Sequence, residues 1–116
     1  MNNRFPCAER LKKNRAIKAV FKTGACVTYS GAKLFYVQNE EKHNRLAFVF
    51  PRSFGNAVKR NRAKRLGREA YRHLRTRIER GWDLVLLVYP NKTDNFAERL
   101  LQLSVLFKRS KIWNNG

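Results

Sequence analysis

Apolar residues recur at helical spacing in three segments of the chain. In the first, Ile17, Val20 and Phe21 fall at positions i, i+3 and i+4, which predicts one apolar face of an amphipathic helix. Asn14 is a suitable N-cap, and Gly24 is a suitable C′ residue. We therefore expect a short helix between these two residues.

The second and third helical segments lie in the C-terminal half. The second follows Gly55, opens at Asn56 and is expected to end at Gly81. Its apolar residues recur at steps of three and four: Ala63, Leu66, Gly67, Ala70, Tyr71, Leu74 and Ile78. In the third, Thr93 or Asp94 can cap a helix with one apolar stripe. That stripe consists of Phe96, Leu100, Leu103 and Phe107.

Three further segments have the composition of β-strands. Residues 26–38 are rich in β-branched and aromatic side chains, with a possible bend at Tyr29-Ser30-Gly31, and residues 46–50 form a second apolar run. The polar residues 39–44 between them fit a hairpin loop, so we expect these strands to pair antiparallel. Residues 82–89 are almost continuously apolar, which is typical of a strand buried on both faces. The order of elements predicts an α+β sandwich with helices packed on a small mixed sheet.

Length and composition limit the classes of protein to be considered. The 116 residues suffice for a single domain, residues 1–116, and the aromatic content is too high for a disordered basic tail. The longest apolar stretch has six residues, so no membrane span is expected. The first thirty residues contain no apolar core of a secretory signal, and we expect a cytoplasmic protein. Cys7 and Cys26 lack CxxC spacing and are interpreted as reduced structural thiols.

The charge is strongly basic and is concentrated in two segments. The chain has 26 Lys or Arg against 8 Asp or Glu, a formal net charge of +18, which indicates a polyanionic partner. The excess is greatest in residues 1–24 and 53–80. In the second segment, one side of the predicted helix is apolar, and the opposite side is expected to present a polar set. That set comprises Asn61, Lys64, Arg65, Arg68, Arg72 and Arg75.

A basic helix face has two interpretations. Charged faces are commonly just solvated, but those usually mix signs, whereas only Glu69 and Glu79 offset the basic residues between Lys59 and Arg80. Arg guanidinium groups also suit bidentate contacts to phosphate. We therefore expect this helix to bind nucleic acid. Asn61 either faces water or ligates a hydrated Mg²⁺ shared with RNA.

Some aromatic residues are candidates for base stacking rather than for the core. On the strand at residues 33–37, Lys33, Phe35 and Val37 alternate onto one face. If that face is open, Phe35 and Lys33 beside Phe21 would form an apolar and basic trough suited to unpaired bases. The alternative is that these side chains belong to the core.

The sequence offers no autonomous catalytic constellation. Its eight acidic residues are scattered, and His43 and His73 lie in different predicted elements. Neither GxSxG nor GxxxxGK[ST] occurs. We expect that the protein alone is not a catalyst.

The stretch Gly55-Asn56-Ala57-Val58-Lys59-Arg60-Asn61-Arg62-Ala63-Lys64-Arg65 closely resembles the Arg-Asn-Arg signature of the bacterial ribonuclease P protein subunit. Blocks at residues 11–24, 68–71 and 83 extend the resemblance over roughly residues 10–108. The resemblance implies a fold like the second domain of ribosomal protein S5, with a left-handed βαβ crossover through the signature helix. That crossover would run against the usual right-handed rule.

The resemblance also implies a function and a set of partners. The protein would assist a catalytic RNA that removes the 5′ leader from precursor tRNA in the bacterial cytoplasm, with Mg²⁺ held mainly by the RNA. Asn61 stays a candidate metal ligand on its own residue type. Neither a membrane nor DNA would be a partner. The RNA-subunit contacts would be Arg60, Asn61, Arg62, Lys64, Arg65, Arg68 and Arg72. The leader contacts would be Ile17, Phe21, Lys33, Phe35, Ala47, Val49 and Arg52.

The chain departs from the family pattern at three places. Pro51-Arg52-Ser53 replaces a Ser-Lys-Lys segment, Ile17 replaces an aromatic residue, and Tyr89 replaces a basic residue after the last strand. Two other functions compete with the family assignment. A structural RNA-binding protein of the ribosomal type would explain the charge and size but not the full signature. A DNA-binding protein would prefer duplex DNA to A-form or single-stranded RNA.

Overall fold

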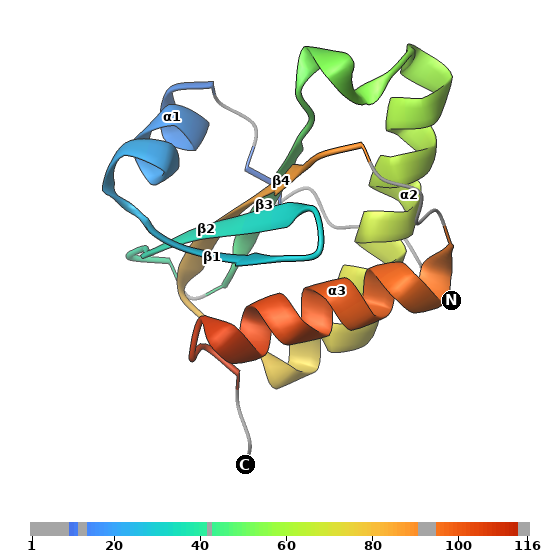
Figure 1. Ribbon diagram of the computed structural model, residues 1–116. Helices are drawn as coiled ribbons and strands as arrows, with labels where there is room; N and C mark the ends of the chain where they lie inside the picture. Colours follow the sequence, from blue (N-terminus) through green and yellow to red (C-terminus); the bar gives the residue numbers. More distant parts are fainter. Residues whose placement is uncertain (1–9, 12–13, 42, 91–94, 114–116) are drawn as a thin grey trace.

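The computed structural model describes residues 10–11, 14–41, 43–90 and 95–113. It contains three α-helices and four β-strands, joined in places by 3-10 turns (Figure 1). In chain order the elements are α1 (Asn14–Thr23), β1 (Ala25–Tyr29), β2 (Ala32–Gln38), β3 (Arg45–Val49), η2 (Arg52–Phe54), α2 (Ala57–Leu74), η3 (Arg75–Arg77), β4 (Trp82–Val88) and α3 (Phe96–Arg109). The α+β class and the mixed sheet predicted from the sequence are confirmed.

The four strands form one sheet in the order β1-β2-β4-β3. Strand β2 is antiparallel to both β1 and β4, whereas β3 and β4 are parallel. The expected antiparallel pairing of the segments at 26–38 and 46–50 is therefore wrong, because β4 lies between β2 and β3. The polar loop does not form the expected hairpin and instead lies beside the start of β4. The true hairpin is the β1–β2 turn, whose central residues Ser30 and Gly31 have φ values of 46° and 81°, as a two-residue type I′ turn requires.

The principal core lies between one face of the sheet and the helices α2 and α3. Alternation along the strands points Leu34, Leu84 and Leu86 to this face, and all three are completely buried. Helix α2 contributes Ala70, Tyr71 and Leu74, and α3 contributes Leu103, Leu106 and Phe107. The two predicted apolar stripes are thus confirmed as core surfaces.

Helix α1 lies against the other face of the sheet (Figure 1). There, Val20 packs with Ala47 of β3 and Val85 of β4. Because Leu84, Val85 and Leu86 are all buried, β4 is covered on both faces, as its apolar sequence predicts.

Helix α2 begins at the expected residue but ends earlier than the sequence predicts. Helix α2 begins after Asn56, whose side-chain oxygen accepts a hydrogen bond from the Lys59 N–H at 3.0 Å. However, α2 ends at Leu74 rather than at Gly81. The chain passes through η3 so that Ile78, 3% exposed, can enter the core in an extended conformation and bridge to Trp113.

The N-cap of α3 is Asn95, which accepts a hydrogen bond from the Glu98 N–H at 2.9 Å. The caps expected from the sequence, Thr93 and Asp94, lie outside the described residues, and the observed cap is Asn95 instead. Cys7 also lies outside the described residues.

Cys26 is a free, exposed thiol on the edge strand β1 and is not part of the core. None of the described helices combines the length and apolarity required to cross a membrane.

Gly24 joins α1 to β1 through a close approach of backbones rather than through a left-handed conformation. Its N–H donates to the Val20 carbonyl at 2.8 Å, and its φ is not among the positive values. A Cβ at this position would lie 2.6 Å from the Val20 carbonyl oxygen and 2.9 Å from that of Tyr36. The expected role of Gly24 as a left-handed C′ residue is therefore replaced by a steric role, in which it lets α1 approach β2.

We expect Gly24→Ala to lower the free energy of unfolding by about 1–3 kcal/mol, because the atoms that would clash with the new methyl group belong to the backbone. Urea denaturation followed by circular dichroism measures this change. Cys26→Ala, which alters an exposed side chain two residues away, is the control and should change stability by less than about 0.5 kcal/mol. Similar small effects of both substitutions would contradict the close-approach argument.

Candidate nucleic-acid interface

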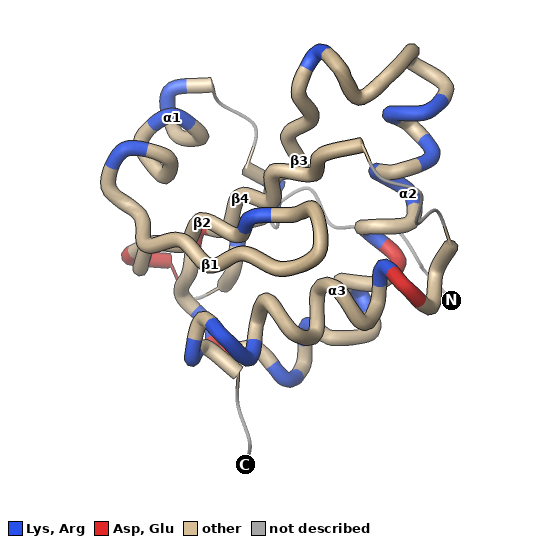
Figure 2. Tube along the Cα trace, viewed as in Figure 1, with Lys and Arg blue, Asp and Glu red and all other residues tan. Residues whose placement is uncertain are grey.

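Basic residues recur along helix α2 (Figure 2), and none of them is among the buried residues of this helix. Ala63, Gly67 and Ala70 form the buried seam, while Asn61, Arg62 and Arg65 are exposed. Arg72 is half-buried. Exposed Arg side chains suit phosphate groups, which planar guanidinium groups bind through paired hydrogen bonds.

Arg60 has a second contact that the helical pattern did not reveal. Its Nη2 donates to the carbonyl oxygens of Pro51 at 3.4 Å and Arg52 at 3.3 Å. These bonds hold the segment that enters α2 against the helix. Arg60 therefore fixes the conformation of this segment as well as contributing positive charge.

Lys64 and Arg68 lie on the flank of α2 that faces β3, not on the side opposite the core as the helical wheel suggested. Together with Arg10 and Phe48 they line a cavity of about 250 Å³. The Arg10–Leu11 segment closes part of this cavity because it pairs with the outer edge of β3: the Leu11 N–H donates to the Leu46 carbonyl at 3.0 Å. Burial lowers the pKa of the Arg68 guanidinium, and the nearby charge of Arg10 lowers it further. An anion in this cavity would relieve that repulsion.

The sheet face beneath α1 is apolar in its centre and polar at both ends. The strand register places three rows across it: Phe35, Val85 and Ala47 in the middle, Lys33, Leu87 and Val49 on one side, and Val37, Asp83 and Arg45 on the other. Helix α1 covers part of the face through Ile17 and Phe21. The Phe21 and Phe35 rings meet edge to face, with centroids 4.7 Å apart.

This arrangement places the two aromatic residues outside the principal core, and their role in base stacking stays a prediction. Phe21 and Phe35 are half-buried and belong to a second, smaller apolar cluster, separate from the principal core. The cluster brings together five of the residues expected to contact the leader: Ile17, Phe21, Phe35, Ala47 and Val49. Lys33 lies at the end of the face, where β3 leads towards η2 and the exposed Arg52. We use the name open cleft for this half-buried sheet face, which extends from Lys33 to Val37 and across to β3.

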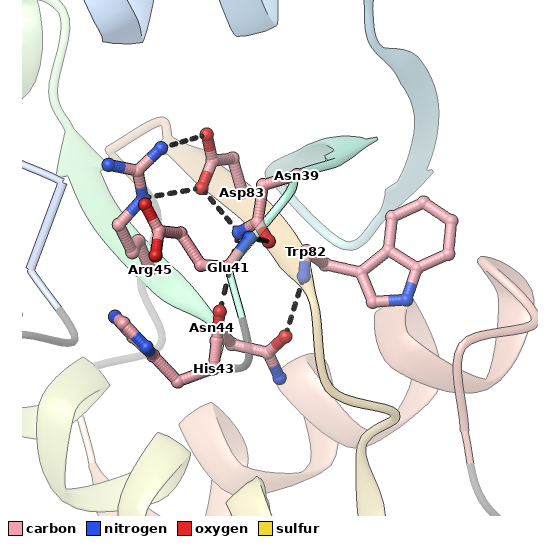
Figure 3. Close-up of polar contacts among 7 residues, drawn as sticks. All are labelled: Asn39, Glu41, His43, Asn44, Arg45, Trp82 and Asp83. Carbon is pink, nitrogen blue, oxygen red and sulfur yellow. Dashed lines mark hydrogen bonds and ion pairs between the residues drawn. The ribbon is translucent and has the colours of Figure 1, made fainter.

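The far end of the open cleft carries an ion pair that the sequence did not predict (Figure 3). Arg45 donates from Nε and Nη2 to the two carboxylate oxygens of Asp83, each at 2.8 Å. Asn39 donates from Nδ2 to the same carboxylate at 2.8 Å and to the His43 carbonyl at 3.3 Å. The hydrogen bonds from Arg45 to Asp83 raise the pKa of the Arg45 guanidinium despite its partial burial.

This network joins the ends of three strands. Asn44 extends it: its side-chain oxygen accepts from the Trp82 N–H at 2.8 Å (Figure 3). The Asn44 Nδ2 also donates to the Glu79 carbonyl at 2.9 Å. The loop from Asn39 to Asn44 is thereby anchored to the start of β4. Because Arg45 neutralises Asp83, the Asp83 carboxylate is not presented unpaired to a polyanion.

The histidines have different surroundings. His73 on α2 packs edge to face on Phe96, with ring centroids 5.2 Å apart, while His43 lines a cavity beside Arg75 and Arg80. Within the described ranges, His, Cys, Asp and Glu form no group of three or more that could hold a metal ion. Asn61 is exposed on α2 and can offer a single amide oxygen. That oxygen suits a hydrated Mg²⁺ whose remaining ligands are water and phosphate oxygens.

The family model described as Ribonuclease P matches residues 5–111 of this sequence. The chain belongs to the ribonuclease P protein family. The curated ribonuclease P protein component of Petrotoga mobilis is 38% identical over 92 residues, which cover 79% of this chain and 78% of that protein. The corresponding protein of an Exiguobacterium species is 32% identical over 104 residues, or 90% and 91% of the two chains.

Solved structures of ribonuclease P proteins have the same fold. The protein from Thermotoga maritima gives a TM-score of 0.77 at 30% identity, covering 87% of this chain and 96% of that one. The protein from Staphylococcus aureus gives a TM-score of 0.82 at 27% identity, covering 91% and 98%. As a member of the ribonuclease P family, the chain is a protein subunit of an endoribonuclease that has an RNA partner subunit. A structural protein of the ribosomal type is not favoured.

We expect Asp83→Ala to lower the free energy of unfolding by about 2–3 kcal/mol, because it leaves the guanidinium of Arg45 and the amide of Asn39 without their shared acceptor. Thermal and urea denaturation measure this loss. Asp83→Asn keeps the volume and one acceptor oxygen and should lose about half as much. If Asp83→Ala were as stable as the wild type, the ion pair would contribute no more than an exposed one.

Proposed function

We propose that this protein uses α2 to bind the RNA subunit of ribonuclease P and the open cleft to hold the single-stranded 5′ leader of precursor tRNA. The RNA subunit would cleave the leader, and the protein would strengthen binding of the substrate. We place this activity in the bacterial cytoplasm. The proposal combines membership of the family with the geometry of two separate surfaces.

The observation that carries the proposal is the difference in chemistry between these surfaces. The exposed side of α2 offers Arg side chains and no Phe, Tyr or Trp ring, which suits the phosphates of a folded RNA. The open cleft offers half-buried Phe21 and Phe35 with Lys33 at one end. Aromatic residues beside cations are typical of sites for unpaired bases, because every base has a π face and every nucleotide a phosphate.

We further propose that Mg²⁺ is held mainly by the RNA subunit and that Asn61 contributes a ligand at the interface. Mg²⁺ prefers oxygen ligands and retains several waters, so one exposed amide beside RNA phosphates is a suitable protein contribution. Arg62 and Arg65 would bind neighbouring phosphates and thereby position the helix.

Reconstitution tests the proposed function directly. The protein is combined with its cognate ribonuclease P RNA, and cleavage of precursor tRNA is measured at low Mg²⁺ with and without the protein. Stimulated cleavage at the mature 5′ end supports the proposal. Tight binding of the RNA without any stimulation would exclude it and would favour a purely structural role.

We expect Arg62→Ala and Arg65→Ala each to weaken binding to the RNA subunit and to reduce the magnitude of the slope of log affinity against log salt concentration. The reduction should be about 0.7–0.9 per lost phosphate contact. Filter binding over a range of salt concentrations gives this slope. Arg77→Ala removes an equal charge from an exposed position in η3 and is the control. An unchanged slope for Arg62→Ala or Arg65→Ala would rule out a phosphate contact at that residue.

We expect Phe35→Ala to weaken binding of precursor tRNA relative to mature tRNA by about 1–3 kcal/mol, the contribution of one stacked base. Equilibrium binding of both substrates to the reconstituted enzyme measures this difference. Phe35→Leu retains apolar volume but lacks a flat ring, so it should preserve stability and still lose the preference for precursor tRNA. Equal losses for the two substrates would mean that Phe35 only packs the protein.

A further inference from the structure

The cavity beside His43 lies at the C-terminal end of α2, away from the signature segment. It has a volume of about 330 Å³, and its basic or protonatable side chains are His43, Arg75 and Arg80. Its walls come from the loop before β3, the end of α2 and the segment that leads to β4. None of the predicted contacts to the RNA subunit or the leader lines this cavity.

The cavity is separate from both surfaces described above. Tyr71 and Ile78, which line it, belong to the principal core, so it lies on the side of the sheet that α2 and α3 cover. The open cleft lies on the opposite face. Helix α2 ends at Leu74, 13 residues after Asn61, a distance of about 20 Å along the helix axis. A group bound in this cavity therefore touches neither the start of α2 nor the leader.

The backbone around Arg80 is held in place by the loop before β3. On one side, the Glu79 carbonyl accepts from the Asn44 Nδ2 at 2.9 Å. On the other, the Gly81 carbonyl accepts from the Asn39 N–H at 2.7 Å. Figure 3 shows Asn39 and Asn44 beside the start of β4. The two walls of the cavity are thus fixed relative to each other before any ligand arrives.

The charges that line the cavity have one sign. Arg75 and Arg80 each carry a full positive charge, and the His43 imidazole has an N–H donor in either protonation state. No Asp or Glu is among the described residues that line it. The partial negative charge at the end of α2, about 0.5 of an elementary charge, is smaller than the two full charges. An anion would relieve the repulsion between the cations, and guanidinium groups are suited to phosphate.

The cavity is better suited to a phosphate than to an unpaired base. Tyr71 is the one Phe, Tyr or Trp among the described residues that line it, and it is 1% exposed. It therefore offers no ring face on which a base could stack, whereas sites for single strands commonly stack bases on aromatic rings. A backbone phosphate of a folded RNA needs only the charges and the hydrogen-bond donors.

We propose that this cavity binds a backbone phosphate of the RNA subunit between Arg75, Arg80 and His43. The inference rests on the proposed function, since it needs α2 to lie against that RNA. It adds a phosphate contact about 20 Å from Asn61 along the helix. The RNA subunit is then held at both ends of α2, which fixes the direction of the helix on the RNA.

Filter binding of the cognate RNA subunit over a range of salt concentrations tests this contact. Arg80→Gln is the primary variant, because Arg75 is also the C-cap residue of α2. It should reduce the magnitude of the slope of log affinity against log salt concentration by about 0.7–0.9. Arg80→Glu places a carboxylate in the cavity and should weaken binding further.

Arg77 supplies the matched control. It is exposed, lies three residues from Arg80 and does not line the cavity. Arg77→Gln should leave the slope unchanged, and Arg77→Glu should weaken binding less than Arg80→Glu. Equal effects at the two positions would mean that only the net charge matters, and they would overturn the proposal.

Tethered cleavage gives a second measurement that leaves the basic residues intact. Thr76 is exposed and lines the cavity. Thr76→Cys, made in a protein that also carries Cys7→Ser and Cys26→Ser, is labelled with iron–EDTA and assembled with the RNA subunit and precursor tRNA. Hydroxyl radicals should cut the RNA subunit within one region. No cut in the RNA subunit, or a cut in the tRNA alone, would contradict the proposal.

The remaining outcomes separate the inference from the function on which it rests. If Arg62→Ala and Arg65→Ala weaken binding of the RNA subunit and Arg80→Gln does not, α2 binds the RNA and the cavity assignment is wrong. If none of these variants alters binding, the proposed role of α2 fails together with the inference. If Arg80→Glu weakens binding of tRNA to the assembled enzyme and leaves assembly with the RNA subunit unchanged, the RNA-subunit assignment is overturned.

Discussion

The central position of β4 is the constraint on which the rest of the structure depends. This strand lies between β2 and β3, and its residues Leu84, Val85 and Leu86 are completely buried. Both faces of the strand are therefore apolar, and both need cover, because burial of such side chains supplies most of the favourable free energy of folding. Helices α2 and α3 cover one face fully. Helix α1 is short and covers only part of the other, which leaves the open cleft as a shallow apolar surface with polar ends.

The parallel pairing of β3 with β4 requires a crossover connection, and α2 supplies it. The same helix thus meets two demands: its buried seam of small residues packs on the sheet, and its outer sides carry the basic groups. Arg60 joins these roles through its hydrogen bonds to the segment before the helix. Lys64 and Arg68 extend the positive charge around the flank towards β3 and Arg10. The basic surface of α2 and the open cleft are consequently neighbours, so one protein can contact a folded RNA and a single strand at once.

Polar groups at the two ends of the sheet have different roles. At one end, Asp83 is satisfied within the protein by Arg45 and Asn39 (Figure 3). At the other, Lys33 lies over the ring of Tyr89. Charge that is paired internally fixes the loops that join the strands, whereas charge over an aromatic ring remains available to an external anion. This distinction is the physical basis for placing the leader at the Lys33 end of the open cleft rather than at the Asp83 end.

The sequence by itself determined the elements and their faces. Periodicity identified the apolar stripes of all three helices, the alternating face of Lys33, Phe35 and Val37, and the buried strand at residues 82–89, because each is a property of neighbouring residues. The signature at residues 55–65 identified the family, and the grouping of Ile17, Phe21, Phe35, Ala47 and Val49 followed from that resemblance. Tertiary structure decided the rest. The insertion of β4 between β2 and β3, the end of α2 at Leu74, the ion pair of Arg45 with Asp83 and the cavity of His43, Arg75 and Arg80 all join residues far apart in the chain. Such contacts depend on how the whole sheet packs, so they cannot be predicted from the pattern of neighbouring residues in the sequence.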